Sequence, residues 1–195
     1  MGTPKPLIDW FGAPLIQRQI EALMDAGVDD VFAVTGSHAA DVESALRLRF
    51  PALSEGPVNA VRNPDYLSGK ITSLKAGLAA LPADVESIVV LAVDQPRPAW
   101  LIRMVLESHR STGAPISSPV YDGHGGHPLI FDGSLRAELA AITEEGLGVR
   151  QVVQAHANRL NRVEVDSPLA RLDMNTPADV EAARKLFPDP RIARK

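Results

Sequence analysis

The chain contains no cysteine, and this absence excludes disulfide bonds and metal sites built on thiolates. It also has no apolar run long enough to cross a membrane, no evident secretory leader and no block of basic residues. Because the net charge is only −4, nucleic acid is not expected as a main partner. Together these absences predict a cytoplasmic protein that binds neither membranes nor nucleic acids. They leave its oligomeric state open.

The remaining composition is that of an ordinary globular protein, with 45% hydrophobic and 23% charged residues. A chain of 195 residues can bury a sizeable core. Neither an internal repeat nor a linker-like stretch divides it. We therefore expect a single domain over residues 1–195.

Alternating helix and strand patterns predict an α/β fold with a mostly parallel sheet in a three-layer arrangement. Helical spacing covers residues 15–26, 41–48, 73–81, 100–111, 136–142, 149–157 and 178–186, and strand patterns cover 30–35, 58–62, 88–93, 115–121, 128–131 and 162–165. Folds of this class normally open with a strand, but this chain opens with Met-Gly-Thr-Pro-Lys-Pro. Prolines at alternate positions suit a central strand poorly, so we expect the sheet to lack its first strand.

The most informative strand pattern is Ser-Ile-Val-Val-Leu-Ala-Val-Asp-Gln-Pro at residues 87–96. Six consecutive apolar residues predict a strand buried on both faces, and Asp94 follows them directly. Open α/β sheets bind ligands beyond the carboxyl ends of their strands. Asp94 is therefore a candidate ligand for Mg²⁺ that accompanies a phosphate-bearing substrate. The alternative is that Asp94 caps the helix that begins near Pro98.

A turn-rich loop over residues 63–69 leads to a helix start at Ser73. Its backbone N–H groups and hydroxyls could receive a base or a phosphate. A plain loop with Ser73 as helix N-cap explains the same residues.

Asp173 and Asn175 form a second candidate pair. Residues two apart on an extended segment share a face, so the two side chains offer two oxygen ligands on one side. The alternative is a helix entry in which Thr176 is the N-cap and Pro177 occupies the first helical position.

Eight short segments follow one another in the order of the motifs of a known family. They are residues 1–8 with 12–15, 34–36, 63–64, 69–78, 91–96, 123–128, 145–150 and 173–177. Among these, Leu-Ala-Val-Asp-Gln-Pro is similar to the family's Leu-x-x-Asp-Gln-Pro metal motif, and Gly-His-Gly-Gly-His-Pro to its Gly-x-x-Gly-His-Pro turn. Across essentially its whole length, the chain resembles the MobA-like nucleotidyltransferases, which include the molybdenum-cofactor cytidylyl- and guanylyltransferases.

The resemblance implies a Rossmann-like nucleotidyltransferase fold of the nucleotide-diphospho-sugar transferase type. It also implies Mg²⁺-dependent transfer of a nucleoside monophosphate from an NTP to a small phosphorylated acceptor such as molybdopterin, with release of pyrophosphate. CTP is the favoured nucleotide and GTP the second choice. Transfer to a sugar phosphate or phospholactate is an alternative, as is a catalytically weak or inactive relative that binds a nucleotide or a partner.

The resemblance also assigns roles by position. Asp94 would hold Mg²⁺ together with Asn175 and Asp173, and Lys5 would contact the nucleotide phosphates. Lys5 and Asp94 are thus the expected catalytic residues. The remaining expected contacts with nucleotide are Asn63, Gly69 and Ser73, and those bordering the acceptor pocket are Gly126, His127 and Pro128.

Two departures from the family pattern bear on activity. The Leu-Ala-Ala-Gly-x-Ser-x-Arg half of the signature, whose loop wraps the nucleotide phosphates, would lie before Met1. Either the start is assigned too late, which we favour, or the chain is a short form without transferase activity; in both cases we expect weak NTP binding and slow turnover. Asn175 stands where the cytidylyltransferase-like branch tends to have Asp, and a neutral amide lowers the expected metal affinity.

Overall fold

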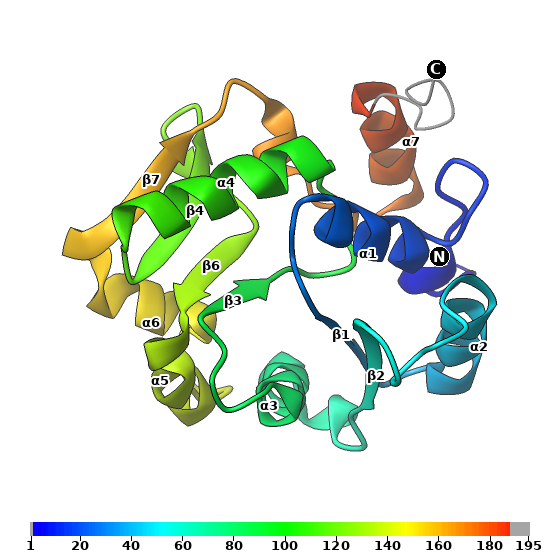
Figure 1. Cartoon of the computed structure of the whole chain (residues 1–195). Helices are drawn as coiled ribbons and strands as arrows, with labels where there is room; N and C mark the ends of the chain where they lie inside the picture. Colours follow the sequence, from blue (N-terminus) through cyan, green and yellow to red (C-terminus); the bar gives the residue numbers. More distant parts are fainter. Residues whose placement is uncertain (1, 188–195) are drawn as a thin grey trace.

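The computed structural model describes residues 2–187, whose strands form two separate sheets (Figure 1). In the first sheet, β1 (Val31–Thr35) pairs in parallel with β2 (Val58–Arg62). The second sheet has the order β3–β6–β4–β5, with β7 also paired to β4. Its strands are β3 (Ser87–Val90), β4 (Ile116–Tyr121), β5 (His124–Gly125), β6 (Leu129–Asp132) and β7 (Leu160–Glu164).

Strand direction in the second sheet is mixed. Both β3 and β4 pair antiparallel with β6, so β3 and β4 run the same way, and β7 is parallel to β4. The predicted α/β class and its parallel strands are confirmed. The reversed strand β6 was not foreseen, because an apolar run of four residues carries no information about its direction.

The predicted absence of a first strand matches the division of the sheet. Among residues 2–187, β1 pairs only with β2 and β3 only with β6, so each sheet keeps an unpaired edge. The expectation of a strand over 88–93 that is buried on both faces was wrong. The strand β3 ends at Val90, and only Ile88 in it is fully buried. Its last partner on β6 is Leu129, and Pro128 just before that residue has no N–H to donate to a ladder.

Seven α-helices cover the described sheets on two sides (Figure 1). They are α1 (Leu15–Asp25), α2 (Ala39–Arg49), α3 (Lys70–Ala80), α4 (Ala99–Thr112), α5 (Arg136–Ala141), α6 (Val149–Ala155) and α7 (Pro177–Leu186). The helices α3, α5 and α6 pack with β3, β4 and β6 in one hydrophobic cluster, while α4 packs on the opposite side of the sheet. This is the predicted three-layer arrangement. The helix α3 begins at Lys70 with Gly69 as its N-cap, so Ser73 lies in the first turn and does not cap it.

A small core cluster joins the two ends of the described chain. Trp10 and Leu15 pack against Met174, Val180 and Ala183, and all of these side chains are buried. Burial of this apolar surface stabilises the contact by roughly 25 cal/mol per Å². The segment that carries Lys5 is thereby held beside the segment that enters α7.

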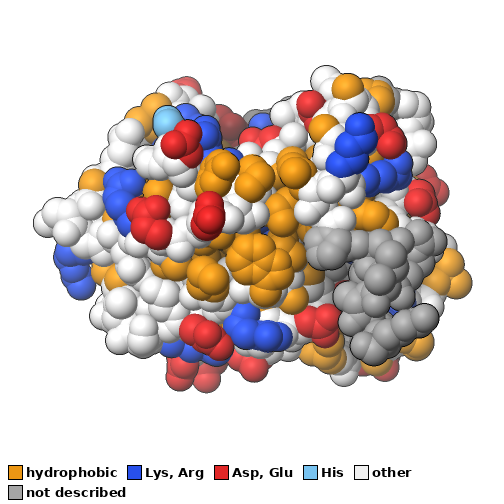
Figure 2. All heavy atoms as spheres, turned by 90° about the horizontal axis from the view of Figure 1, so that it is seen from above, with side chains coloured by type: hydrophobic (Ala, Val, Ile, Leu, Met, Phe, Trp, Pro, Cys, Tyr) orange, Lys and Arg blue, Asp and Glu red, His pale blue; other side chains and the backbone are white. Residues whose placement is uncertain are grey.

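The surface of the described residues has one apolar area in view in Figure 2, over the face on which α4 lies in Figure 1. Trp100 and Met104 of α4 are among the exposed large hydrophobic residues. Half-exposed side chains of this kind are normal on protein surfaces and do not by themselves mark a site. No helix within residues 2–187 combines the length and the hydropathy needed to cross a membrane.

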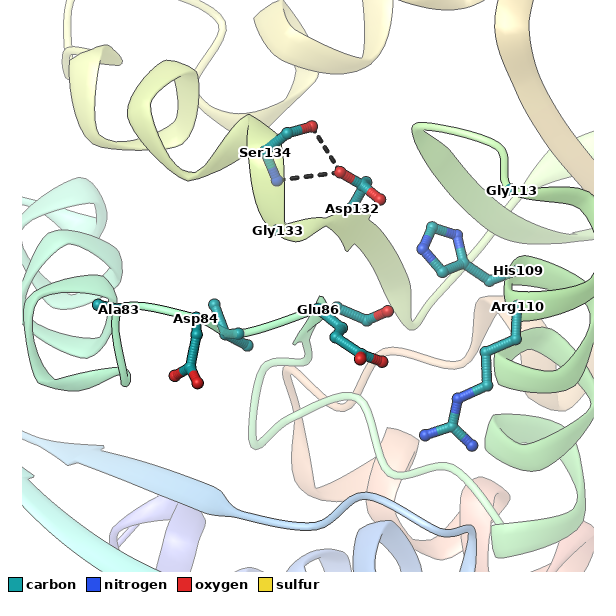
Figure 3. A pocket seen from close by; sticks show the side chains of 11 residues that line it. Ala83, Asp84, Glu86, His109, Arg110, Gly113, Asp132, Gly133 and Ser134 are labelled. Atoms are coloured by element: carbon teal, nitrogen blue, oxygen red, sulfur yellow. Dashed lines mark hydrogen bonds between the residues drawn. The ribbon is translucent and has the colours of Figure 1, made fainter.

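A cavity of about 690 Å³ opens near the first residue of β3, the end of the strand away from Asp94 (Figure 3). Its wall includes the carboxylates of Glu86 and Asp132 and the imidazole of His109, which is only 4% exposed. Asn161 donates from Nδ2 to the Ser117 hydroxyl at 3.0 Å, and that hydroxyl lies 2.9 Å from His109 Nδ1. The Ser117 hydroxyl thus links Asn161 and His109 in one buried hydrogen-bonded chain.

The buried His109 makes the stability of the fold pH-dependent. Burial lowers its pKa below the ordinary value of 6.5, against a smaller opposing effect of Asp132, and the Arg110 charge lowers it further. Below about pH 6.5 the unfolded chain therefore binds more protons than the folded one. The free energy of unfolding consequently decreases as the pH is lowered, by at most about 1.4 kcal/mol per pH unit. Urea unfolding at pH values from about 7.5 to about 5, which bracket the ordinary histidine pKa of about 6.5, measures how the free energy of unfolding changes per pH unit. The slope is expected to shrink in H109N and to persist in H156N, which alters the surface pair of His156 and Glu138. An equal slope in all three proteins would contradict the prediction.

Candidate active site

Three predicted site residues meet beyond the end of β3. Lys5, in the short 3₁₀ helix η1 (Lys5–Leu7), donates from Nζ to Asp94 Oδ2 at 2.7 Å and to Asn175 Oδ1 at 3.0 Å. The Lys5 and Asp94 side chains are 31% and 29% exposed, so a ligand can reach them. Asp94 does not cap α4, whose N-cap is Pro98 without a side-chain bond, so the capping alternative was wrong.

Hydrogen bonds of the adjacent Met174 and of Gln95 hold Asp173 close to Asp94. The backbone N–H of Met174 donates to the Asp94 carbonyl at 2.8 Å, and Gln95 Nε2 donates to Asp173 Oδ1 at 2.7 Å. The Met174 side chain is only 1% exposed and points into the core. Because side chains alternate along an extended segment, Asp173 and Asn175 both lie on its outer side.

The helix-entry interpretation of this segment also holds. Thr176 caps α7 by accepting from the Asp179 N–H at 3.2 Å, and Pro177 takes the first position. The Asp179 carboxylate accepts in return from the N–H groups of Thr176 at 2.7 Å and Asn175 at 3.0 Å. These hydrogen bonds lower the pKa of Asp179. The cap thus fixes the backbone of Asn175 while leaving its amide side chain free to meet Lys5.

Arg97 is a residue near the site that the motifs did not single out. It is 2% exposed, and its guanidinium donates only to backbone carbonyls. Nε donates to His127 O at 2.9 Å, Nη1 to Pro96 O at 2.9 Å and Leu172 O at 2.8 Å, and Nη2 to Ala170 O at 3.1 Å. Burial lowers its pKa to about 10, although the charges of Asp173 and Asp94 oppose this shift. At neutral pH the guanidinium is therefore still charged.

The residues predicted to border the acceptor pocket lie against Ala170. The His127 N–H donates to the Ala170 carbonyl at 2.9 Å, and a Cβ on Gly126 would overlap that same oxygen. Burial, and next the Arg97 charge, lower the pKa of His127, so its ring is neutral near pH 7. Within residues 2–187, His127 Nδ1 and Gln95 Oε1 are buried without a hydrogen-bond partner. The charges of Asp173 and Asp94 act on the His127 ring, and Gln95 contacts Asp173 through Nε2, so both unpaired atoms belong to residues near these carboxylates.

The remaining predicted nucleotide contacts form a second group at the start of α3. The buried Asn63 donates from Nδ2 to Thr72 Oγ1 at 2.9 Å and to Ser73 Oγ at 3.0 Å. The Glu144 carboxylate accepts from the Ile71 N–H at the first turn of α3. A Cβ on Gly69, whose φ is +124°, would overlap that carboxylate. The backbone conformation therefore favours glycine there, and a larger residue would also displace the Glu144 side chain.

The structure therefore brings the predicted residues together in two groups. Lys5, Asp94, Asn175 and Asp173 form the first group, which Arg97 ties to residues 126–128. Asn63, Gly69 and Ser73 form the second. In the described part of the chain no hydrogen bond or ion pair links the two groups. The loop around Glu144 was not assigned a role from sequence, because a carboxylate on a distant loop gives no local signal that it will reach α3.

The first group has the donor chemistry of a site for a hard divalent cation. Its side chains offer carboxylate oxygens from Asp94 and Asp173 and an amide oxygen from Asn175, the ligand type that Mg²⁺ and Mn²⁺ prefer. The Lys5 ammonium lies between two of these oxygens and supplies, in this structure, the positive charge that a metal ion would otherwise provide. Among residues 2–187 there is no cluster of three or more His, Cys, Asp or Glu side chains in metal-binding proximity. A metal here would therefore depend on Asn175 and on oxygens supplied by a substrate.

Known proteins are similar to this chain in sequence and in fold. The chain is 27% identical to nicotine blue oxidoreductase of Paenarthrobacter nicotinovorans, over 94% of this chain and 86% of that protein. It is 24% identical to the molybdenum cofactor cytidylyltransferase of Escherichia coli (strain K12), over 96% of this chain and 90% of that protein. The crystal structure of Mycobacterium tuberculosis H37Rv Rv0371c in complex with manganese has the same fold, with a TM-score of 0.75 and 22% identity over 94% of this chain and 92% of that one.

A family model identifies the chain directly. The model of the MobA-like NTP transferase domain matches residues 1–160, which include Lys5, Asp94 and the loop at residues 126–128 that is predicted to border the acceptor pocket (the acceptor-side loop). This agrees with the resemblance carried by the ordered motifs. The chain belongs to the family of MobA-like NTP transferase domains.

Proposed function

We propose that the protein is a Mg²⁺-dependent nucleotidyltransferase that transfers CMP from CTP to a small phosphorylated acceptor such as molybdopterin. The observation that carries the proposal is the Lys5 ammonium held between Asp94 and Asn175 beyond the end of β3. A cation, two carboxylates and an amide in one half-exposed place are the groups that a triphosphate with its metal needs. Family membership makes nucleotidyl transfer the expected chemistry.

Each residue has a definite task in this reaction. An acceptor phosphate or hydroxyl oxygen attacks the α-phosphorus, the bond from that phosphorus to the bridging oxygen breaks, and pyrophosphate leaves. Lys5 neutralises charge on the phosphates, while Asp94, Asn175 and Asp173 would hold the cation. When bound, Mg²⁺ supplies charge stabilisation for the phosphate oxygens. No side-chain nucleophile is needed, so positioning by residues of the two groups does most of the work.

The finer assignments rest on different observations. CTP and the molybdopterin-type acceptor are supported by similarity to a protein named as a molybdenum cofactor cytidylyltransferase. A divalent metal is supported by the manganese complex of a protein with this fold. On the side of residues 126–128, His127 Nδ1 and Gln95 Oε1 are buried without a hydrogen-bond partner, and a polar acceptor could satisfy them only after the surrounding side chains move.

The first test measures pyrophosphate release from CTP, GTP, ATP and UTP with Mg²⁺ and molybdopterin. We expect release with CTP, and we expect D94N to lower the rate by about a hundredfold or more because a charged group at the reacting phosphates is lost. The control is D84N, which neutralises an exposed carboxylate at the cavity near the start of β3. Nucleotide binding without pyrophosphate release in the unmodified protein would contradict the proposed activity.

The second test uses the position of Lys5. Because its ammonium lies on two of the oxygens proposed to hold the metal, removing its charge should favour a cation and disfavour a triphosphate. For K5Q we expect Mn²⁺ affinity, measured by electron paramagnetic resonance, to rise about threefold to tenfold at this partly exposed pair. Affinity for CTP, measured by calorimetry, should fall. The control K75Q removes an exposed lysine of α3 and should change neither value. A parallel fall of both affinities in K5Q would show that Lys5 only supports the fold.

A further inference from the structure

We infer that Arg97 is the positioning residue of this site and its permanent positive charge, whereas Lys5 is the exchangeable one. The inference rests on the proposed function, because it concerns the same cation-binding oxygens. It assigns different roles to the two positive side chains, a fixed one for Arg97 and a displaceable one for Lys5, which the family motifs do not assign.

The first argument is where the bonds of Arg97 go. Its four carbonyl acceptors lie on three segments, and each segment carries residues of the site. Pro96 follows Asp94 and Gln95, His127 belongs to the acceptor-side loop, and Leu172 directly precedes Asp173. One rigid guanidinium therefore sets the spacing of the metal-side oxygens and of the acceptor-side loop at the same time.

The second argument is that arginine suits this place and other residues do not. Four carbonyl oxygens converge on the buried guanidinium. The Ala170 oxygen also accepts from the His127 N–H, but leaving the other three without this donor would be strongly unfavourable. Arginine offers five N–H donors in a fixed plane, and four of its bonds here go to carbonyls. Lysine keeps the charge but has three N–H donors on one nitrogen, so it cannot make all four of these bonds, which start from three separate nitrogens of Arg97.

The third argument is the balance of charge. The group contains two carboxylates, Asp94 and Asp173, and the charges of both act on Arg97. Lys5 supplies a second positive charge through its bond to Asp94. Four bonds and near-complete burial fix Arg97, whereas Lys5 has two bonds and a third of its side chain exposed. When a cation or a triphosphate arrives, Lys5 can move and Arg97 cannot.

The test compares two arginines of the same local chemistry. In R97K the fixed plane of donors is lost near the site. In the matched control R136K it is lost elsewhere, because Arg136 donates to the carbonyls of Leu78, Leu81 and Pro82 at the end of α3. Both variants keep the charge, and their melting temperatures report the general structural effect. A third variant, R97Q, keeps a planar donor without charge and provides a second measurement if R97K is too unstable.

Two readouts separate positioning from general stability. For R97K, Mn²⁺ affinity by electron paramagnetic resonance should fall about tenfold to a hundredfold, the size typical for residues that orient metal ligands. R97Q should also weaken Mn²⁺ binding because the plane of donors is lost, although removal of a positive charge near the site offsets part of this loss. Amide hydrogen exchange should quicken at residues 126–128 and 170–175 in both Arg97 variants. R136K should leave Mn²⁺ affinity and exchange in these segments unchanged.

The outcomes distinguish this inference from the proposed function. If the unmodified protein releases no pyrophosphate, the proposed function fails, but Mn²⁺ affinity and exchange still decide the role of Arg97. If the unmodified protein binds no Mn²⁺, exchange at 126–128 and 170–175 decides it. The inference is overturned if R97K and R136K lower the melting temperature alike and the Arg97 variants change these segments no more than R136K does.

Discussion

The backbone hydrogen bond from Met174 to the Asp94 carbonyl is the contact on which the site depends. This bond holds the segment before α7 next to the segment that follows β3. The burial of Met174 beside Trp10 brings the N-terminal segment to the same point. Lys5, Asp94 and Asn175 are far apart in sequence and meet only because these two contacts coincide. The site is therefore a product of backbone placement first and of side-chain chemistry second.

The divided sheet does not prevent this placement. The helix α3 packs on β1 and β2 and also on α5, while α1 packs on both β1 and α4. Helices thus join the two sheets on both sides, although no strand ladder among the described residues does. The first group of site residues belongs to the end of β3 and to segments packed beside α1 and α7. The second group belongs to β2 and α3, so its position relative to the first depends on this helical bridging.

Much of the fold was predictable, because helices and buried strands leave periodic patterns and the family motifs keep their order. The matching motifs placed Asp94, Asn175 and Lys5 in one site, but they assigned Lys5 to the nucleotide phosphates and did not predict its bond to Asp94. The early end of β3 was not predictable, because apolar character at Leu91 to Val93 reports burial in general and does not reveal how far the neighbouring strand extends. The direction of β6 and the reach of Glu144 to α3 are likewise set by distant partners.

Arg97 shows why residues of this kind escape sequence reasoning. An arginine between two prolines has the local character of an exposed turn, and arginine is rarely buried. Its burial follows from carbonyl groups of residues 127, 170 and 172, which no local pattern connects to residue 97. Asp94 gave the opposite impression, since its place after an apolar run suggested either a metal ligand or a helix cap. The structure shows that Asp94 does not cap α4 and that its carboxylate is paired with the Lys5 ammonium. A carboxylate that folding pairs with a movable ammonium, near a fixed and buried guanidinium, is arranged to exchange the ammonium for another cation.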